Sequence, residues 1–398
     1  MKIRMYNVGF GDCFCLRDRN KSLMVDFGTS NSRIDGRTRR EVFDVIISDL
    51  TTIARKNLLL THFHLDHLSG LLYMMKHRSS SYDFGKIYLS DVFSEPGMSH
   101  TLALLLLADL VKNSYLPSRQ VSLFALVEAL CKKPQKVELL YRGKEFEGKY
   151  EALWPDRDII REETEKIFSE IEKSHGKIMG NIVGFAEKLR QIVCSMTENA
   201  RAKGDAPAEA QGQEEGENQA NGKVKPAVNV LDREFRELRA VPEFCRLVQY
   251  LEAEKTNLRQ FKNKISVVFQ NARDGELNLL FTGDVPTGYL QMIAENYDGK
   301  VPLHEHYWCV KVPHHGTEAH YFDFSSYSPE NMLISNGVYY ANGKKQCKAY
   351  RISPRYAGLF YINDAHMYCS NCDCCDGYRN GCTCKESDVI APMYYKDI

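Results

Sequence analysis

Three imidazoles and one carboxylate lie within six consecutive positions near the start of the chain, as His62, His64, Asp66 and His67. Imidazole and carboxylate groups are the side-chain ligands that first-row divalent ions accept. The spacing lets His62 and His64 face one ion and Asp66 and His67 a second, so the motif predicts two adjacent metal sites. A surface histidine tract, or imidazoles satisfied by hydrogen bonds in a core, fits less well, because an apolar segment precedes the motif and a helix-like segment follows it.

Two further clusters follow apolar segments in the same way, Gly283-Asp284 and His314-His315-Gly316. Each alone could be an ordinary turn or a chance pair, but together with the first motif they predict one dinuclear centre. Asp284 is the natural bridge, because one carboxylate can join two cations about 3.5–4 Å apart. Water held between two such ions has its pKa lowered from about 16 toward 7, which gives a metal-bound hydroxide as the nucleophile. Asp66 can also orient that nucleophile.

The elements that must position these residues follow an alternating α/β pattern. Polar residues such as Asp26 and Thr61 stand at the ends of predicted strands, which is where open α/β sheets place their chemistry. The predicted strands are 3–8, 13–17, 22–26, 57–61, 86–90, 265–270, 277–282 and 308–312, with a helix near 68–77.

The middle of the chain has a different character. Apolar residues recur there at helical spacing, which predicts a helical insertion over 99–259. Within it, about 200–227 has no aromatic residue and few branched apolar ones, so we expect a mobile linker. The predicted domains are therefore a core of 1–98 and 260–365, the insertion, and a cysteine-rich tail of 366–398.

Composition excludes some classes of protein. Lys plus Arg and Asp plus Glu both number 52, so no global field of one sign favours nucleic acid or a cationic partner. No apolar window of about 18 residues predicts a membrane span. The first residues alternate like a strand and lack the apolar core of a signal peptide, so we expect a cytoplasmic protein with no membrane attachment.

The motif residues His62, His64, Asp66, His67, Asp284 and His315 resemble the metal-binding motifs of the metallo-β-lactamase fold hydrolases. Segments 7–12, 25–28, 282–284, 312–317 and 331–337 further resemble the group related to the soluble domain of the ComEC DNA-uptake proteins. The resemblance covers about 1–95 and 260–365. It implies an α/β fold of the αββα four-layer sandwich type, with two mixed sheets face to face and helices outside. It also implies a hydrolase with two Zn or Mn ions, and in the nearest group a phosphodiesterase or nuclease.

The resemblance also implies a role for each matching residue. His62 and His64 match first-metal ligands, and Asp66 and His67 match second-metal ligands. Asp284 matches the bridge and His315 the last ligand. His314 is left to support the site or to give a proton to the leaving group, while Asp12 and Asp26 match positions that shape the site, unless they serve ordinary turns.

The chain departs from the family pattern at one metal ligand. A third histidine for the first metal normally precedes the Gly-Asp strand, but here that place reads Lys-Asn-Lys-Ile-Ser over 262–266. Asn263 could offer a carbonyl oxygen instead, which would favour Mn or Mg over Zn because oxygen ligands suit harder ions. His100 and His175 of the insertion are alternatives, although a surface role suits each of them better.

Six of the 13 cysteines lie between Cys369 and Cys384. A Cys-x2-Cys pair is a usual zinc knuckle, so we expect one structural zinc there, with a loose reduced or disulfide-joined loop as the alternative. The predicted ligands are Cys369, Cys372, Cys382 and Cys384.

Three functions are open at this point. The first is a metal-dependent phosphodiesterase or nuclease acting on a phosphodiester substrate such as nucleic acid. The second is a hydrolase of a small ester, lactone, thioester or amide, which the same metals would serve. The third is a conditionally active subunit that docks a protein partner through the helical insertion. For the first, Lys262, Lys264, Arg273 and Lys311 could form a positive rim around the cleft.

Overall fold

The computed structural model places the chain in two compact units. Unit 1 comprises Met1–Phe84, Leu140–Asp156 and Asn263–Ile398, and unit 2 comprises Gly85–Leu139 and Arg157–Lys262. The structure describes residues 1–18, 21–34, 36–111, 121–132, 136–204, 229–253, 257–337, 340–341, 344–345, 352–353, 355–356, 366–370 and 395–398.

The first sheet of unit 1 contains the strand order β18-β1-β2-β3-β6. Strands β1, β2 and β3 are antiparallel neighbours, β6 runs parallel to β3, and β18 pairs with β1. The guanidinium of Arg4 joins Asp397 of β18 to Asp49, at 2.9 Å from the latter. The bounds are β1 Lys2–Tyr6, β2 Cys13–Asp18, β3 Lys21–Phe27, β6 Arg55–Leu60 and β18 Tyr395–Asp397.

The second sheet has the order β17-β14-β13-β12-β11-β10-β9. Strands β9 to β12 are antiparallel neighbours, whereas β12, β13, β14 and β17 run parallel. Parallel strands align their carboxyl ends at one edge, and Asp284 after β12 and His315 after β13 lie at this edge. The bounds are β9 Glu145–Phe146, β10 Tyr150–Trp154, β11 Val268–Asn271, β12 Leu279–Phe281, β13 Cys309–Lys311, β14 Asn331–Ile334 and β17 His366–Cys369.

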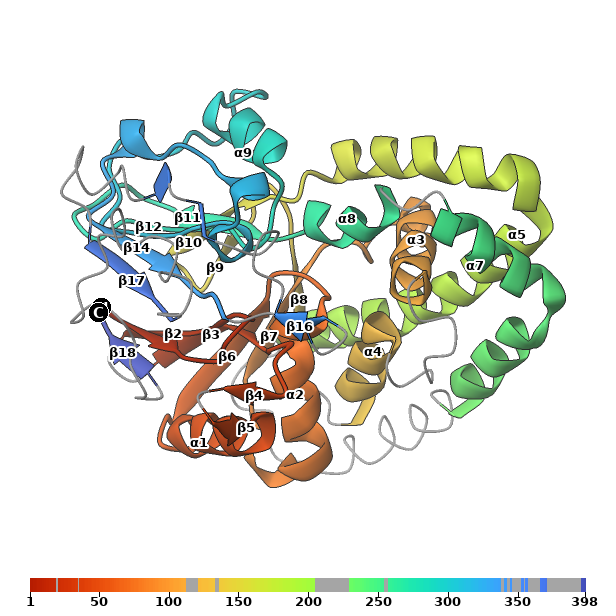
Figure 1. Cartoon of the computed structure of the whole chain (residues 1–398), viewed down its shortest axis with the longest axis horizontal. Coiled ribbons are helices and arrows are strands. Elements are labelled where there is room, and N and C mark those ends of the chain that lie inside the picture. The colour runs from red at the N-terminus through yellow and green to blue at the C-terminus, as the bar shows by residue number, and fades with distance from the viewer. Residues whose placement is uncertain are drawn as a thin grey trace. The chain divides into compact units, whose positions relative to one another are not determined.

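Helices α1 (Arg39–Thr51) and α2 (Leu65–His77) lie against the first sheet (Figure 1). α1 begins with a capping box between Thr38 and Glu41, in which each side chain binds the other's backbone N–H. α9 (Thr287–Ala294) packs on the second sheet through Tyr289, whose ring lies 4.7 Å from that of Trp154. Short two-stranded pieces complete the unit, β4 (Arg33–Ile34) with β5 (Arg37–Thr38) and β15 (Tyr340–Ala341) with β16 (Lys344–Lys345).

The two sheets meet in an apolar core. The rings of Phe14 and Phe281 pack edge to face at 5.5 Å, one from each sheet. The backbone N–H of Val267 donates to the carbonyl of Thr61 at 2.8 Å, just where the first metal motif begins. The mixed α/β class is therefore as predicted, and it is consistent with a metallo-β-lactamase type of fold. The four-layer order stays a prediction.

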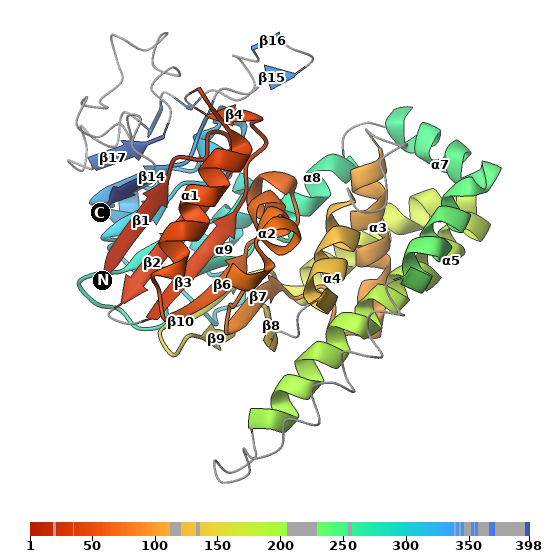
Figure 2. The same ribbon diagram turned by 90° about the horizontal axis from the view of Figure 1, so that it is seen from below.

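Unit 2 consists mainly of helices. Its α5 (Arg157–Gly204) is made of two helical segments that meet at a kink at His175, and the second segment is seen along its length in Figure 2. Nearly all of α3 is buried, and Thr101 of α3 bonds Thr164 of α5 at 2.9 Å. No described helix has the length and apolar character that a membrane crossing requires. The remaining bounds are β7 Lys86–Ser90, α3 Ser99–Leu110, α4 Ser122–Lys132, β8 Lys136–Leu140, α7 Pro242–Ala253 and α8 Asn257–Lys264.

The structure differs from the predicted helical insertion in one respect. Strands β8, β9 and β10 lie within the 99–259 range, and β9 and β10 belong to the second sheet. Strand pairing of this kind depends on distant partners, so helical periodicity on either side hid it. The start of the predicted linker at about 200–227 belongs to α5, which continues to Gly204, and the remainder, 205–227, lies outside the described residues. The predicted domain boundaries stay a prediction.

Candidate metal centre

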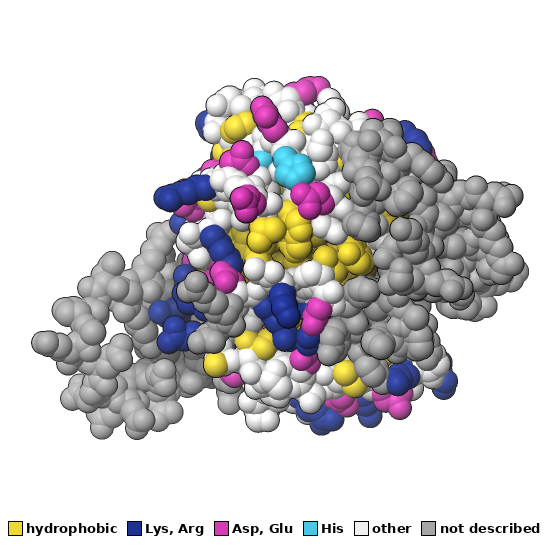
Figure 3. Space-filling model, turned by 90° about the vertical axis from the view of Figure 1, so that its left-hand side faces the viewer, with side chains coloured by type: hydrophobic (Ala, Val, Ile, Leu, Met, Phe, Trp, Pro, Cys, Tyr) yellow, Lys and Arg dark blue, Asp and Glu magenta, His cyan; other side chains and the backbone are white. Residues whose placement is uncertain are grey.

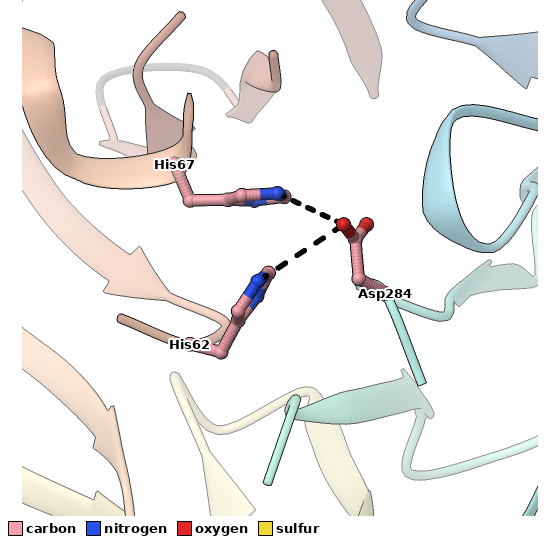
Figure 4. Close-up of side chains that lie close together, drawn as sticks. All are labelled: His62, His67 and Asp284. Atoms are coloured by element: carbon pink, nitrogen blue, oxygen red, sulfur yellow. Dashed lines mark hydrogen bonds and ion pairs between the residues drawn. The ribbon is translucent and has the colours of Figure 1, made fainter. Parts of the chain in front are cut away.

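The predicted ligands come from three loops at strand ends. β6 ends at Leu60, and His62 and His64 follow directly, with His64 at the N-cap of α2. Asp66 and His67 therefore lie in the first turn of that helix. Asp284 follows β12 and His315 follows β13, which are parallel neighbours. Figure 4 shows the side chains of His62, His67 and Asp284 directed toward one another.

The first two histidines present nitrogen atoms to a common point. His62 Nε2 lies 2.8 Å from His64 Nδ1. The hydroxyl of Thr61 donates to Asp26 Oδ2 and so is free to accept a hydrogen bond from His62 Nδ1, at 3.1 Å. That bond puts the proton of His62 on Nδ1 and leaves a lone pair on Nε2. Burial also lowers the pKa of His62, which keeps the ring in the neutral form that a metal requires.

The imidazoles of His67 and His315 are likewise oriented by a hydrogen bond at Nδ1. His67 Nδ1 lies 2.8 Å from Asp26 Oδ2, and His315 Nδ1 lies 2.8 Å from the carbonyl of Ser335. Both bonds use the Nδ1 proton, so each Nε2 is left with a lone pair for a metal. These Nε2 atoms lie 3.2 Å and 3.5 Å from Oδ2 of Asp284. His315 Nε2 is buried and has no hydrogen-bond partner among the described residues.

In this arrangement the imidazole lone pairs face the negatively charged carboxylates, and a positive charge between them is needed to stabilise the group. Although burial opposes it, the fields of Asp284 and Asp12 raise the pKa of His315 to about 10. Against burial, the imidazoles of His67 and His315 and the ammonium of Lys311 lower the pKa of Asp284. A divalent ion would supply that positive charge while the imidazole rings stay neutral.

Among the described residues, four sets of three side chains have ligand atoms close enough to hold an ion, and two of these sets consist of predicted ligands alone. Those two are His62 with His67 and Asp284, and Asp66 with His67 and His315. The neutral Nε2 atoms and ionised carboxylates suit a divalent metal. Asp66 also has a pKa below its ordinary value, because the nearby imidazoles outweigh the effect of burial. The residues present therefore fit the predicted metals, and which of them bind stays a prediction.

Asp26 and Asp12 lie behind the ligands. Asp26 accepts from the N–H and the hydroxyl of Thr61, both at 2.8 Å, as well as from His67. Asp12 lies between Lys311 and His315, whose Nδ1 is 3.3 Å from Asp12 Oδ1. Both carboxylates are 1% exposed. Asp26 orients His67 and Asp12 pairs with Lys311, so each carboxylate has contacts beyond those of an ordinary turn.

The comparison with protein families agrees with this geometry. Residues 6–80 match the model of the Metallo-beta-lactamase superfamily. The matched segment runs from Tyr6 past the end of α2, and so contains the whole of the first motif. No curated protein matches the chain. The superfamily match and the His and Asp groups together support a metal-dependent hydrolase. The ComEC-like resemblance, the metal identity and the substrate remain proposals.

Lys311 was not predicted in the centre. Its ammonium group donates to the carbonyl of Gly283 at 2.9 Å and forms ion pairs with Asp12 and Asp284, and the residue is 1% exposed. The predicted positive rim is therefore wrong for this lysine. It is also wrong for Lys262, which is buried and pairs with Asp109 in unit 2. The available signal was the position of Lys311 at the end of an apolar strand, directly before the His-His motif.

His314 lies beside the superfamily motif in a turn where both it and His315 have positive φ angles, 45° and 57°. Its Nδ1 is 2.9 Å from the hydroxyl of Thr317, and its ring stacks on that of His320 at 3.9 Å. Burial lowers the pKa of His314 to about 3, so the ring is neutral at pH 7. If the Thr317 hydroxyl donates to Nδ1, the proton of the ring lies on Nε2, and this N–H can be offered to a substrate oxygen.

The replacements predicted for the superfamily's missing histidine have different surroundings. Asn263 is buried, and its Oδ1 has no hydrogen-bond partner among the described residues, so it has an oxygen to offer. In unit 2, His100 binds Glu165 at 2.7 Å, and His175 packs on a tyrosine ring at 4.9 Å. Asn263 is the better candidate because its oxygen is unused.

The predicted zinc site of the tail is described only at its first residue. Cys369 ends β17 and is buried. The other predicted ligands, Cys372, Cys382 and Cys384, lie outside the described residues. The structural zinc stays a prediction.

Proposed function

We propose that this protein is a metal-dependent phosphodiesterase or nuclease, with the four-layer sandwich and ComEC-like character that its motifs resemble. The observation that carries the proposal is the convergence of three imidazole Nε2 atoms on one carboxylate oxygen, Asp284 Oδ2. Each of those imidazoles has its other nitrogen engaged, at 2.8 Å, 2.8 Å and 3.1 Å. Such an arrangement orients the rings in the way that hydrogen bonds at the other ring nitrogen orient metal-bound histidines.

The side chains have separate roles in the proposed reaction. His62, His64, Asp66, His67, Asp284 and His315 would hold the metal ions. Divalent metals there supply Lewis acidity, which makes water more acidic and stabilises charge on phosphoryl oxygens. Asp66, whose side chain is 18% exposed, reaches solvent, as does the partly buried His64, and the Asp66 carboxylate can orient the attacking water. His314 can donate an N–H to the substrate.

The proposed substrate class is based on the resemblance of the motifs, and the surface charge adds little support for a nucleic-acid substrate. Among the residues that the structure describes, Figure 3 shows both Lys or Arg and Asp or Glu side chains on the face it presents. A nucleic acid would then gain little from long-range attraction on that face. We therefore expect modest affinity and a preference for short or single-stranded substrates that reach the metal centre itself.

The test compares two substrate classes under the same conditions. Purified protein is loaded with Mn or Zn and given bis(para-nitrophenyl) phosphate, single-stranded DNA, a nitrophenyl acyl ester and a lactone. We expect phosphodiester cleavage that disappears in Asp284→Ala, while Asp158→Ala, a change at a carboxylate whose side chain is 82% exposed, keeps it. Cleavage of the acyl ester or lactone alone would favour the small-molecule hydrolase. Full metal loading without any turnover would reject both.

A further inference from the structure

Lys311 lies inside the metal centre, although lysine is not a metal ligand there. It is the last residue of β13, next to Phe281 at the end of β12. Its ammonium group is held by the carbonyl of Gly283, by Asp12 Oδ2 and by Asp284 Oδ1, the last at 3.4 Å. Lys311, Asp12 and Asp284 are each 1% exposed, so this contact is closed to solvent.

The two carboxylate oxygens of Asp284 face different groups. Oδ1 faces the ammonium group, whereas Oδ2 faces His67 Nε2 at 3.2 Å, His315 Nε2 at 3.5 Å and His62 Nε2 at 4.0 Å. A carboxylate whose Oδ1 is engaged in this way offers a metal one oxygen and not two. Asp284 would then bridge through Oδ2 alone.

A further group of potential ligands lies on the lysine side. Ligand atoms of Asp12, Asp284 and His315 lie within 4.8 Å of one another, close enough to hold an ion. The ammonium group of Lys311 already contacts both carboxylates of this group. A divalent cation and an ammonium group repel each other strongly at such distances in a buried site. The ammonium group of Lys311 therefore takes the place of a divalent cation at Asp12, Asp284 and His315.

We propose that Lys311 is a built-in cation of the centre, which occupies the Asp12–Asp284–His315 group and confines divalent metals to the Oδ2 side of Asp284. It is a positioning residue, because it acts through Asp284 and Asp12 and not on the substrate. The inference rests on the metal centre of the proposed function. It predicts that the number of bound metals is limited by a lysine, which no metal-binding motif would indicate.

The test counts metals after the ammonium group is removed. Wild type and Lys311→Ala are loaded with Mn or Zn, passed through a desalting column and analysed by plasma mass spectrometry. We expect Lys311→Ala to hold one more ion per chain than wild type, because two carboxylates lose their cation and space is opened. Adding Asp12→Asn should return the count to the wild-type value. Lys311→Arg, which keeps the charge, should also keep the wild-type count.

Two further variants cover misfolding of the alanine variant and the general effect of losing a buried lysine. Lys311→Gln is milder, since its amide can still donate to the Gly283 carbonyl, and it should gain the same ion if the alanine variant does not fold. Lys56 provides the matched control, because it is another buried lysine of unit 1, paired with Asp83 at 2.6 Å. Lys56→Met should leave the metal count unchanged.

The outcomes separate this inference from the proposed function. If wild type binds no divalent metal, the metal centre and the proposed function fail together with the inference. If wild type binds metal, and both Lys311→Ala and Lys311→Gln hold the wild-type number of ions, only the role given to Lys311 is refuted. A gain that persists after Asp12→Asn would also refute it, because the extra ion would then lie elsewhere.

Discussion

Replacing Asp26 by Asn should weaken metal binding without removing a metal ligand. Asp26 Oδ2 accepts the Nδ1 proton of His67 at 2.8 Å and the hydroxyl of Thr61 at 2.8 Å, while Oδ1 accepts the Thr61 N–H. An amide can keep the Oδ1 bond but puts an NH2 group in place of Oδ2. His67 must then lose its bond or move its proton to Nε2, where it would point at Asp284. In that second form the ring cannot bind a metal.

The size of the effect follows from that single bond. A hydrogen bond to a charged group contributes about 1.5–3 kcal/mol, and loss of a carboxylate that orients a metal-bound histidine typically costs about 10- to 100-fold in metal affinity. Asp26 has a φ of 57°, a conformation that Asn adopts readily, so the backbone should be preserved.

Competition with a chromophoric chelator would measure the dissociation constants for Mn and Zn. Asp49→Asn is the matched control, because Asp49 of α1 is an ion-paired carboxylate bound to Arg4 and Arg17 and not to the centre. It should lower thermal stability and leave metal affinity unchanged. Wild-type affinity in Asp26→Asn would show that the proton of His67 Nδ1 does not control metal binding.

Three other substitutions test how the centre and the units are supported. A Cβ on Gly28 would lie 2.6 Å from the carbonyl oxygen of Asp66, so Gly28→Ala should displace the start of α2 and lower activity by about 100-fold, measured as kcat/KM. Arg142→Met would strand the partly buried Asp298, now bound at 2.8 Å, and should cost about 3 kcal/mol in urea unfolding at pH 7. Because the Arg142 hydrogen bond lowers the pKa of Asp298 from 3.8, that cost should shrink below about pH 4. Gly180→Ala, in an open position of α5, should raise stability by about 1 kcal/mol, and an unchanged or lower melting temperature would contradict this.

Local sequence was enough to predict the candidate ligands that the structure brings together. His62 to His67 lie in one loop, and Asp284 and His315 each follow a short apolar run, so each could be recognised without knowing its partners. The structure brings these segments together because β12 and β13 are parallel neighbours in the second sheet.

Pairings between distant segments could not be predicted in this way. β10 pairs with β11 across the helical segments that separate them in sequence, and β18 at the chain's end pairs with β1 at its start. The range predicted as a cysteine-rich tail accordingly contributes β17 to one sheet and β18 to the other. Short strands of three to five residues carry little signal of their own, and their stability comes from the neighbours they meet.

Lys311 shows most clearly why residue types alone do not define the centre. A lysine at a strand end is usually solvated, and its burial here depends on Asp12, far away in sequence. Once that ion pair and the bonds from Thr61 and His67 to Asp26 are assigned, two carboxylates already have partners within the protein. Asp66 and Oδ2 of Asp284 are left with imidazole lone pairs opposite them. On the proposal made for Lys311, we expect the positions of these protons and of one ammonium group, more than the number of histidines, to determine where divalent metals bind.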